Sequence, residues 1–182
     1  VLQHDVVEQT EWNGNDLIGD AYAHAEACEP WTAGAEAVTQ GGVFRAGGTG
    51  GHHQAAGGTN DGVTRMLTQL KIQFDIVDAD ARLDRYELLI LPDEIEVNAA
   101  LARKLRAYLK RGGALLLSGK SGLDQDGKPV LPEMGIATHG ESPFATTYLR
   151  FGPAIGAGVP ATDHVMYERG WRVTPTRGAE TL

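Results

Sequence analysis

Two nearly uninterrupted apolar runs, separated by one amphipathic stretch, constrain the fold of this chain more than any other feature. The runs are LLILP at residues 88–92 and ALLLS at residues 114–118. A strand that is apolar on both faces needs cover on both faces, which is the situation in a parallel sheet. Because the residues between the runs have helical spacing, the order strand, helix, strand predicts a right-handed βαβ unit.

The helix between the two runs carries its own start and stop signals. Asn98 is a good N-cap residue, and the pair Gly112-Gly113 is typical of a left-handed C-terminal cap. Cations gather near the predicted C-terminus, where the helix dipole favours them. The side chains expected to face the sheet are Leu101, Leu105, Tyr108 and Leu109.

Further elements extend the alternation on both sides. Upstream, the patterns predict an amphipathic helix over 15–28 that ends at Pro30, a strand within 35–44, a helix from about residue 59 and a strand at 74–78. The inner face of the helix near residue 59 is expected to be Val63, Met66, Leu67 and Leu70. We therefore expect an α/β domain with a parallel sheet and helices on both faces. After residue 124 the runs TTYLRF, DHVMYE and WRVTP predict short strands of an antiparallel or irregular C-terminal arm.

Composition excludes several classes of function. A formal net charge of −8 argues against nucleic acid as a partner, because phosphates attract a basic face. No apolar run reaches the roughly 18 to 20 residues that span a bilayer, so no membrane partner is expected. A lone cysteine, Cys28, rules out an internal disulfide and fits a reducing compartment, for which we expect the cytoplasm. The chain opens on Val1, so we expect a piece cut from a longer protein.

The stretch LSGKSGL at residues 117–123 invites two catalytic interpretations, and its spacing fits neither. A phosphate-binding P-loop needs a glycine five places before the one that precedes Lys120, and that position is Ala114. A nucleophile elbow, G-x-S-x-G, needs its second glycine at position 123, whereas the glycine is Gly122. The favoured interpretation is a turn after a strand, with its serine and lysine side chains facing solvent.

Two weaker candidate sites remain. Polar side chains follow both apolar strands at the carboxyl edge of the sheet, where open α/β folds collect ligands, and they suggest a possible ligand pocket. Its residues are Asp93, Glu94, Ser118, Lys120 and Ser121. Helix capping by the acids is the favoured alternative explanation.

The other candidate is His52-His53, in a glycine-rich segment over 47–58. Adjacent histidines rarely face one metal ion, so we expect a loop that contacts a partner or a neighbouring domain. No catalytic residue, cofactor or metal ligand is predicted in this chain.

With the elements placed, residues 59–126 resemble a known family. The resemblance is carried by a helix leading into QFDIVD, then YELLILPD, then LRAYLKRGGALLLSGKSGLD. This order is similar to the trimerisation domain of β-galactosidase-type glycoside hydrolases. The resemblance implies a flavodoxin-like fold related to class I glutamine amidotransferases, and a non-catalytic accessory role in carbohydrate metabolism. It also implies self-association, with a trimer suspected, and an upstream catalytic barrel domain in the same chain.

The amidotransferase relatives keep a catalytic cysteine on the turn after the strand that corresponds to ALLLS. This sequence has Gly119, Lys120 and Ser121 there, so amidotransferase chemistry is not expected. The alternative hypothesis is a sugar or small-molecule binding module, or a degenerate amidotransferase-like enzyme. The expected organisation is a helical lead-in over 1–33, a flavodoxin-like core over 34–126 and a C-terminal extension over 127–182.

Overall fold

A computed structural model describes residues 14–45, 59–176 and 178–182 of the chain. The chain divides into two compact units, Val1–Val38 and Thr39–Leu182. The domain boundaries expected after residues 33 and 126 stay a prediction.

The first unit contains one helix, α2 (Gly14–Thr32), among its described residues. The prediction that Pro30 ends this helix is wrong, because α2 continues through the proline. Proline removes a single N–H donor, and this close to the end of a helix only the one bond is lost. A backbone bond of helical spacing spans the proline, with the Ala33 N–H donating to the Glu29 carbonyl at 2.8 Å.

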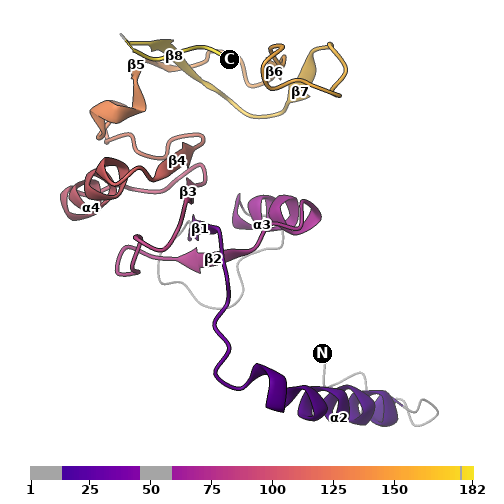
Figure 1. The fold of residues 1–182 in the computed structure, drawn as a ribbon. Helices are drawn as coiled ribbons and strands as arrows, with labels where there is room; N and C mark the ends of the chain where they lie inside the picture. Colours follow the sequence, from indigo (N-terminus) through magenta and orange to yellow (C-terminus); the bar gives the residue numbers. More distant parts are fainter. Residues whose placement is uncertain (1–13, 46–58, 177) are drawn as a thin grey trace. The chain divides into compact units, whose positions relative to one another are not determined.

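The second unit contains a parallel sheet of four strands (Figure 1). The strands are β1 (Gly41–Phe44), β2 (Phe74–Val77), β3 (Leu88–Leu91) and β4 (Ala114–Leu117), and each lies close to its predicted place. Their order across the sheet is β2-β1-β3-β4, with every neighbouring pair parallel. This is the order of the first four strands of a flavodoxin-like fold, so the predicted fold class is confirmed.

Two helices cover opposite faces of this sheet. Helix α4 (Ala99–Lys110) begins as predicted, with the Asn98 side chain accepting hydrogen bonds from the N–H groups of Ala100 and Leu101. At the other end Gly112 has a positive φ of 92°. The following Gly113 is needed for a different reason, because a Cβ there would lie 2.2 Å from the Tyr108 ring. That close approach lets the Tyr108 hydroxyl donate to the Glu87 carbonyl at 2.8 Å, at the start of β3.

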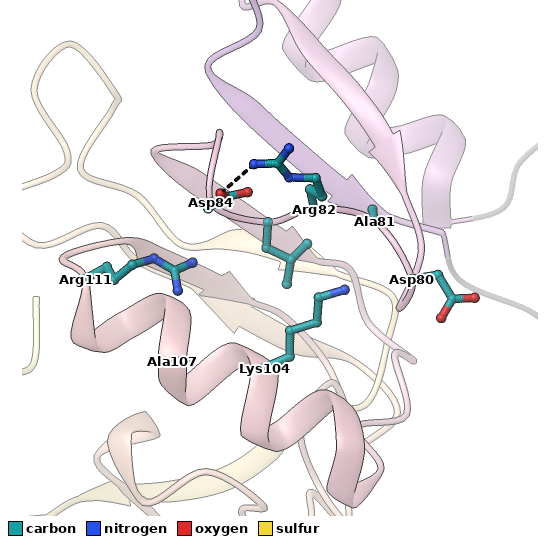
Figure 2. A pocket seen from close by; sticks show the side chains of 8 residues that line it. Asp80, Ala81, Arg82, Asp84, Lys104, Ala107 and Arg111 are labelled. Carbon is teal, nitrogen blue, oxygen red and sulfur yellow. Dashed lines mark hydrogen bonds and ion pairs between the residues drawn. The ribbon is translucent and has the colours of Figure 1, made fainter.

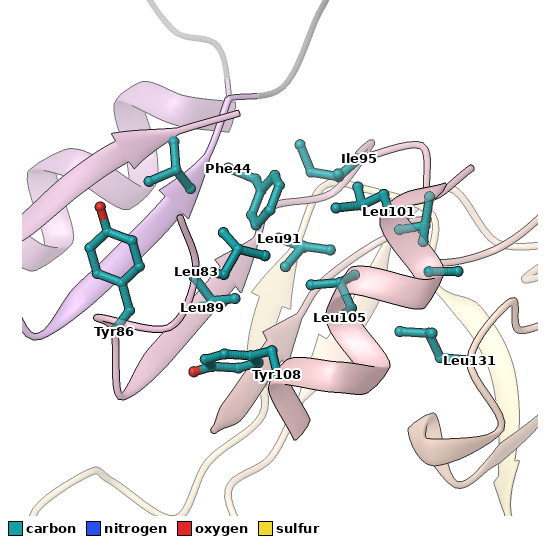
Figure 3. Close-up of a cluster of buried hydrophobic side chains, with 13 residues drawn as sticks. Phe44, Leu83, Tyr86, Leu89, Leu91, Ile95, Leu101, Leu105, Tyr108 and Leu131 are labelled. Atoms are coloured by element: carbon teal, nitrogen blue, oxygen red, sulfur yellow. The ribbon is translucent and has the colours of Figure 1, made fainter. Parts of the chain in front are cut away.

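The face of the sheet under α4, which we call the α4 face, holds the larger part of the core (Figure 3). The sheet residues Phe44, Leu89 and Leu91 are buried there against Leu105 of α4. The connection after β2 adds further buried side chains, as does the segment after residue 130. The full cluster is Phe44, Val77, Leu83, Tyr86, Leu89, Leu91, Ile95, Val97, Leu101, Ala102, Leu105, Tyr108 and Leu131.

The opposite face, which we call the α3 face, is covered by α3 (Thr59–Gln69). Among the described residues, its buried cluster consists of Val43, Ile90 and Leu67, with four partly buried side chains packed against it. The prediction that Met66 and Leu70 also face the core is wrong, since they are 56% and 64% exposed. Leu70 lies beyond the last helical residue, and helical spacing no longer determines its direction there.

The C-terminal part of the second unit forms two small antiparallel ribbons. One pairs β5 (Ile136–Glu141) with β8 (Trp171–Pro175), and the other pairs β6 (Thr147–Leu149) with β7 (His164–Met166). The predicted strands β6, β7 and β8 are confirmed as an antiparallel arm. Strand β5 was not predicted, because its sequence IATHGE has little apolar content.

Candidate functional site at the carboxyl edge of the sheet

The turns that follow β3 and β4 lie against each other and bring the predicted polar residues together. The Ser118 hydroxyl donates to Asp93 Oδ1 at 2.7 Å, and the backbone N–H of Asp93 donates back to Ser118 Oγ at 3.0 Å. The N–H of Lys120 donates to the carbonyl oxygen of Asp93 at 2.5 Å. Asp93 therefore joins the two turns through its side chain and through both of its backbone groups.

The hydrogen bonds of Asp93 with Ser118 and Lys120, which we call the Asp93 clamp, explain two unusual backbone conformations. Asp93 has a positive φ of 44°, which costs free energy for any residue with a Cβ. Gly119 has φ of 55°, and a Cβ at that position would lie 2.8 Å from the Cα atom of Asp93. Only glycine permits both the conformation and the close approach. Gly119 thus allows the turn after β4 to lie directly against the turn after β3.

Ser121 is buried, which corrects the expectation that this serine faces solvent. Its side chain is 2% exposed, and its Oγ accepts a hydrogen bond from the Ile95 N–H at 3.0 Å. The N–H of Gly122 donates to the Ile95 carbonyl at 3.3 Å. A buried backbone N–H needs a partner, and the hydroxyl supplies one for a loop residue that has left the sheet. Ser121 has a structural role here.

The remaining predicted residues point outward. Lys120 pairs with Glu141 of β5 at 3.1 Å, with both side chains largely exposed. Glu94 is exposed as well. Neither Glu94 nor Asp93 caps α4, so the explanation of these acids as helix caps is wrong, since Asn98 occupies that position.

The arrangement lacks the parts of a nucleophilic site. An activated serine needs a neighbouring base. Of the histidines in the part of the chain that the structure describes, His139 contacts Thr174 and His164 contacts the Pro160 carbonyl. The thiol of Cys28 lies on α2, 3.7 Å from His24 Nε2, in the other unit. What the geometry provides instead is a rigid junction between the β3 and β4 turns.

A shallow hollow of about 260 Å³ lies elsewhere, between the connection after β2 and helix α4 (Figure 2). Sequence reasoning missed it, because its two walls are at least twenty residues apart in the chain. Two of its three cations have partners: Arg82 pairs with Asp84 at 3.1 Å, and Lys104 Nζ donates to the Ala79 carbonyl at 2.7 Å. The lining residues are Asp80, Ala81, Arg82, Leu83, Asp84, Lys104, Ala107 and Arg111.

Three further expectations concern metals, partners and membranes. Within the described ranges, no three His, Cys, Asp or Glu side chains group so that they could hold a metal ion. His52 and His53 lie outside the described residues. Among the helices in the described parts, none is both long and apolar enough to cross a membrane.

The four-stranded parallel sheet and its strand order define an α/β domain of the flavodoxin-like class. Comparison with known proteins agrees with the expected resemblance: residues 64–136 match the model of the family described as the beta-galactosidase trimerisation domain. The predicted resemblance is confirmed.

Individual relatives are glycosidases. One is beta-galactosidase BglY of Alicyclobacillus acidocaldarius, 32% identical over 57 residues, which cover 31% of this chain and 8% of that protein. Among solved structures, alpha-L-fucosidase isoenzyme 2 from Paenibacillus thiaminolyticus is similar, with 35% identity and a TM-score of 0.78. That similarity covers 90% of this chain and 26% of the fucosidase. The chain thus spans about a quarter of the fucosidase and less than a tenth of the galactosidase.

Proposed function

We propose that this chain is the non-catalytic accessory domain of a glycoside hydrolase, and that it holds three copies of the enzyme together. The observation that carries the proposal is the match of residues 64–136 to the beta-galactosidase trimerisation domain. The similar region makes up 26% of the fucosidase chain, and this supports attachment of the domain to a catalytic domain. The use of Ser118 and Ser121 in hydrogen bonds between turns supports a structural role for the carboxyl edge.

Mass measurement of the full-length protein tests the assembly. We expect light scattering coupled to size exclusion to give three times the mass of one chain at micromolar concentration. A monomer over the whole accessible concentration range would contradict the proposed self-association.

Activity measurements test the accessory role. The two named relatives indicate aryl β-D-galactosides and aryl α-L-fucosides as the first substrates to try. Ser118→Ala and Lys120→Ala in the full-length protein are expected to leave kcat and KM for the cleaved glycoside unchanged. A fall in kcat with either variant would favour an enzyme role for the carboxyl edge.

The alternative, a sugar or small-molecule binding module at Asp93, Glu94, Ser118, Lys120 and Ser121, makes a different prediction. A sugar or amide that raises the melting temperature, and loses this effect in Ser118→Ala, would support it.

A cytoplasmic location also belongs to the proposal of an accessory domain, and it rests on the single cysteine of the chain.

A further inference from the structure

The α3 face of the sheet carries apolar side chains that its helix leaves uncovered. Strand register places Ile76, Val43, Ile90 and Leu116 in one row, because Val43 is opposite both Ile76 and Ile90, and Ile90 is opposite Leu116. Residues in register on parallel neighbours point to the same face. The two inner members are buried, whereas Ile76 is 51% and Leu116 is 54% exposed.

The width of the sheet explains this pattern. Ile76 lies on β2 and Leu116 on β4, the two outer strands, so three strand spacings of about 4.8 Å place them about 14 Å apart. A helix with its side chains is about 10 Å across, so α3 covers the middle of the sheet, and among the described residues Ile76 and Leu116 on the two flanks stay about half exposed. Parallel sheets with an open apolar face are rare in isolated domains.

The uncovered residues coincide with the segment that matches the trimerisation family. Between residues 64 and 136, all of which the structure describes, the large apolar side chains that are exposed are Met66, Leu70, Ile76 and Leu116. Two of them are on the α3 face of the sheet, and the other two are on α3 or directly after it. The apolar surface left on the matched segment is therefore this face.

We propose that copies of this chain associate through the α3 face, with the Ile76 flank of one copy packed against the Leu116 flank of the next; this rests on the self-association proposed above. A ring of three needs two different patches on each copy, because the contacts of a closed threefold ring are heterologous. The α3 face supplies two such patches, on opposite edges of the sheet and separated by α3.

The test uses charge substitutions in the full-length protein. Ile76→Asp and Leu116→Asp each place a carboxylate in one patch, where burial without a partner is costly. Each variant is expected to have the mass of one chain at a concentration at which the unaltered protein is a trimer. Phe144→Asp is the matched control, because Phe144 is exposed on the C-terminal arm outside the matched segment, and it is expected to stay trimeric.

Mixing the two variants tests the pairing itself. The Ile76→Asp chain retains its Leu116 flank and the Leu116→Asp chain retains its Ile76 flank, so one intact contact forms between them and the ring does not close. The expected product of a 1:1 mixture is a heterodimer, detected by native mass spectrometry. A mixture that stays monomeric would overturn the proposed arrangement, and so would homodimers of each single variant, which pairing of like patches would give.

Further outcomes separate this proposal from the function on which it rests. A monomeric unaltered protein would overturn both. An unaltered trimer that persists in Ile76→Asp and Leu116→Asp would overturn the assignment of this face alone. A melting temperature of the variants below that of the unaltered protein diluted until it is monomeric would also overturn it, by showing that the chain's own residues cover the face. Ile76→Thr and Leu116→Thr, which place a β-branched side chain suited to a strand at each position, provide a milder second pair.

Discussion

The two faces of the four-stranded sheet differ in how many pieces of chain cover them. On the α4 face, the helix is joined by Leu83 and Tyr86 from the connection after β2 and by Leu131 from the segment after β4. On the α3 face, the described residues provide α3 and, directly after it, the partly buried Ile72. Because one helix is about 10 Å wide, a four-stranded sheet needs more than one covering element, and among the described segments several such elements lie only on the α4 face.

Adjacent residues on β2 show the consequence. Asp75 points to the α4 face, where the Tyr86 hydroxyl donates to its carboxylate at 2.8 Å and Thr39 Oγ1 donates at 3.0 Å. Its neighbour Ile76 points to the α3 face and is half exposed. On the α4 face of β2 the charged side chain of Asp75 has two hydrogen-bond partners, whereas on the α3 face of the same strand the side chain of Ile76 is half exposed. The α4 face thus serves stability within one chain, and the α3 face is suited to association.

The largest expected difference between the faces comes from shortening a leucine on each. Leu105 is fully buried in the α4-face core, so Leu105→Ala is expected to lower the free energy of unfolding by about 2–5 kcal/mol. Leu116 is half exposed, and Leu116→Ala in the monomer is expected to change it by about 0.5 kcal/mol or less. Urea denaturation followed by circular dichroism measures both. Equal losses would show that the α3 face is also packed within the chain.

Next in size is the loss of the Ser121 hydroxyl. Ser121→Ala leaves the buried N–H of Ile95 without its acceptor, at an expected cost of about 1–3 kcal/mol. Ser118→Ala is the matched control, because Ser118 is exposed and water replaces its bonds to Asp93, so we expect a smaller loss. Urea denaturation of the two variants side by side is the measurement. A larger loss of unfolding free energy for Ser118→Ala would mean that the exposed hydrogen bonds between Ser118 and Asp93, and not the buried bond between Ser121 and Ile95, hold the two turns together.

Sequence reasoning succeeded where the structure depends on local signals. The strands β3 and β4, the Asn98 cap and the Gly112 end of α4 all follow from neighbouring residues, and all were predicted. It failed where contacts from distant residues decide the outcome. Ser121 is buried because Ile95, twenty-six residues earlier, needs an acceptor, and no local pattern announces this.

The same limit applies to the α3 face. Helical spacing placed Met66 among the core residues, but the spacing does not say how many layers cover a sheet. Likewise, the hollow beside α4 comes from a connection whose path across the helix has no sequence signature. Family resemblance was predictable, since it depends on the order of the elements, which local patterns do give.

A smaller effect is expected from the cap of α4, the helix on the better covered face. Asn98→Ala removes the acceptor for the N–H groups of Ala100 and Leu101, and we expect a loss of about 0.5–2 kcal/mol. Asn98→Asp retains a capping oxygen and is expected to stay near the unaltered stability. Thermal and urea unfolding of the three proteins measure the difference. A loss in Asn98→Asp as large as that in Asn98→Ala would show that the site needs the amide and not a cap.

The smallest expected effect is a dependence of stability on pH through Asp75. At the edge of the α4 face, the carboxylate of this residue contacts the Tyr86 hydroxyl and the Arg85 guanidinium. The hydrogen bond from Tyr86 is the main cause that holds the pKa of Asp75 below its ordinary value of 3.8, with further help from Thr39 and Arg85. A lowered pKa means that the unfolded chain takes up the proton first as the pH falls. The stabilisation by this carboxylate is therefore fully present above pH 4 and is lost as the pH falls through the folded-state pKa.

Asp75→Asn removes this titration, so its melting temperature should fall less steeply than that of the unaltered protein when the pH is lowered from 5 to 3. Asp84→Asn is the control, because Asp84 pairs with Arg82 on the surface, where solvent screens the interaction. Its slope should stay close to the unaltered one. If Asp75→Asn keeps the full slope while Asp84→Asn loses it, the acid sensitivity of the domain comes from the surface pair, and the edge of the α4 face owes its stability to the buried Tyr86 ring and not to the charge beside it.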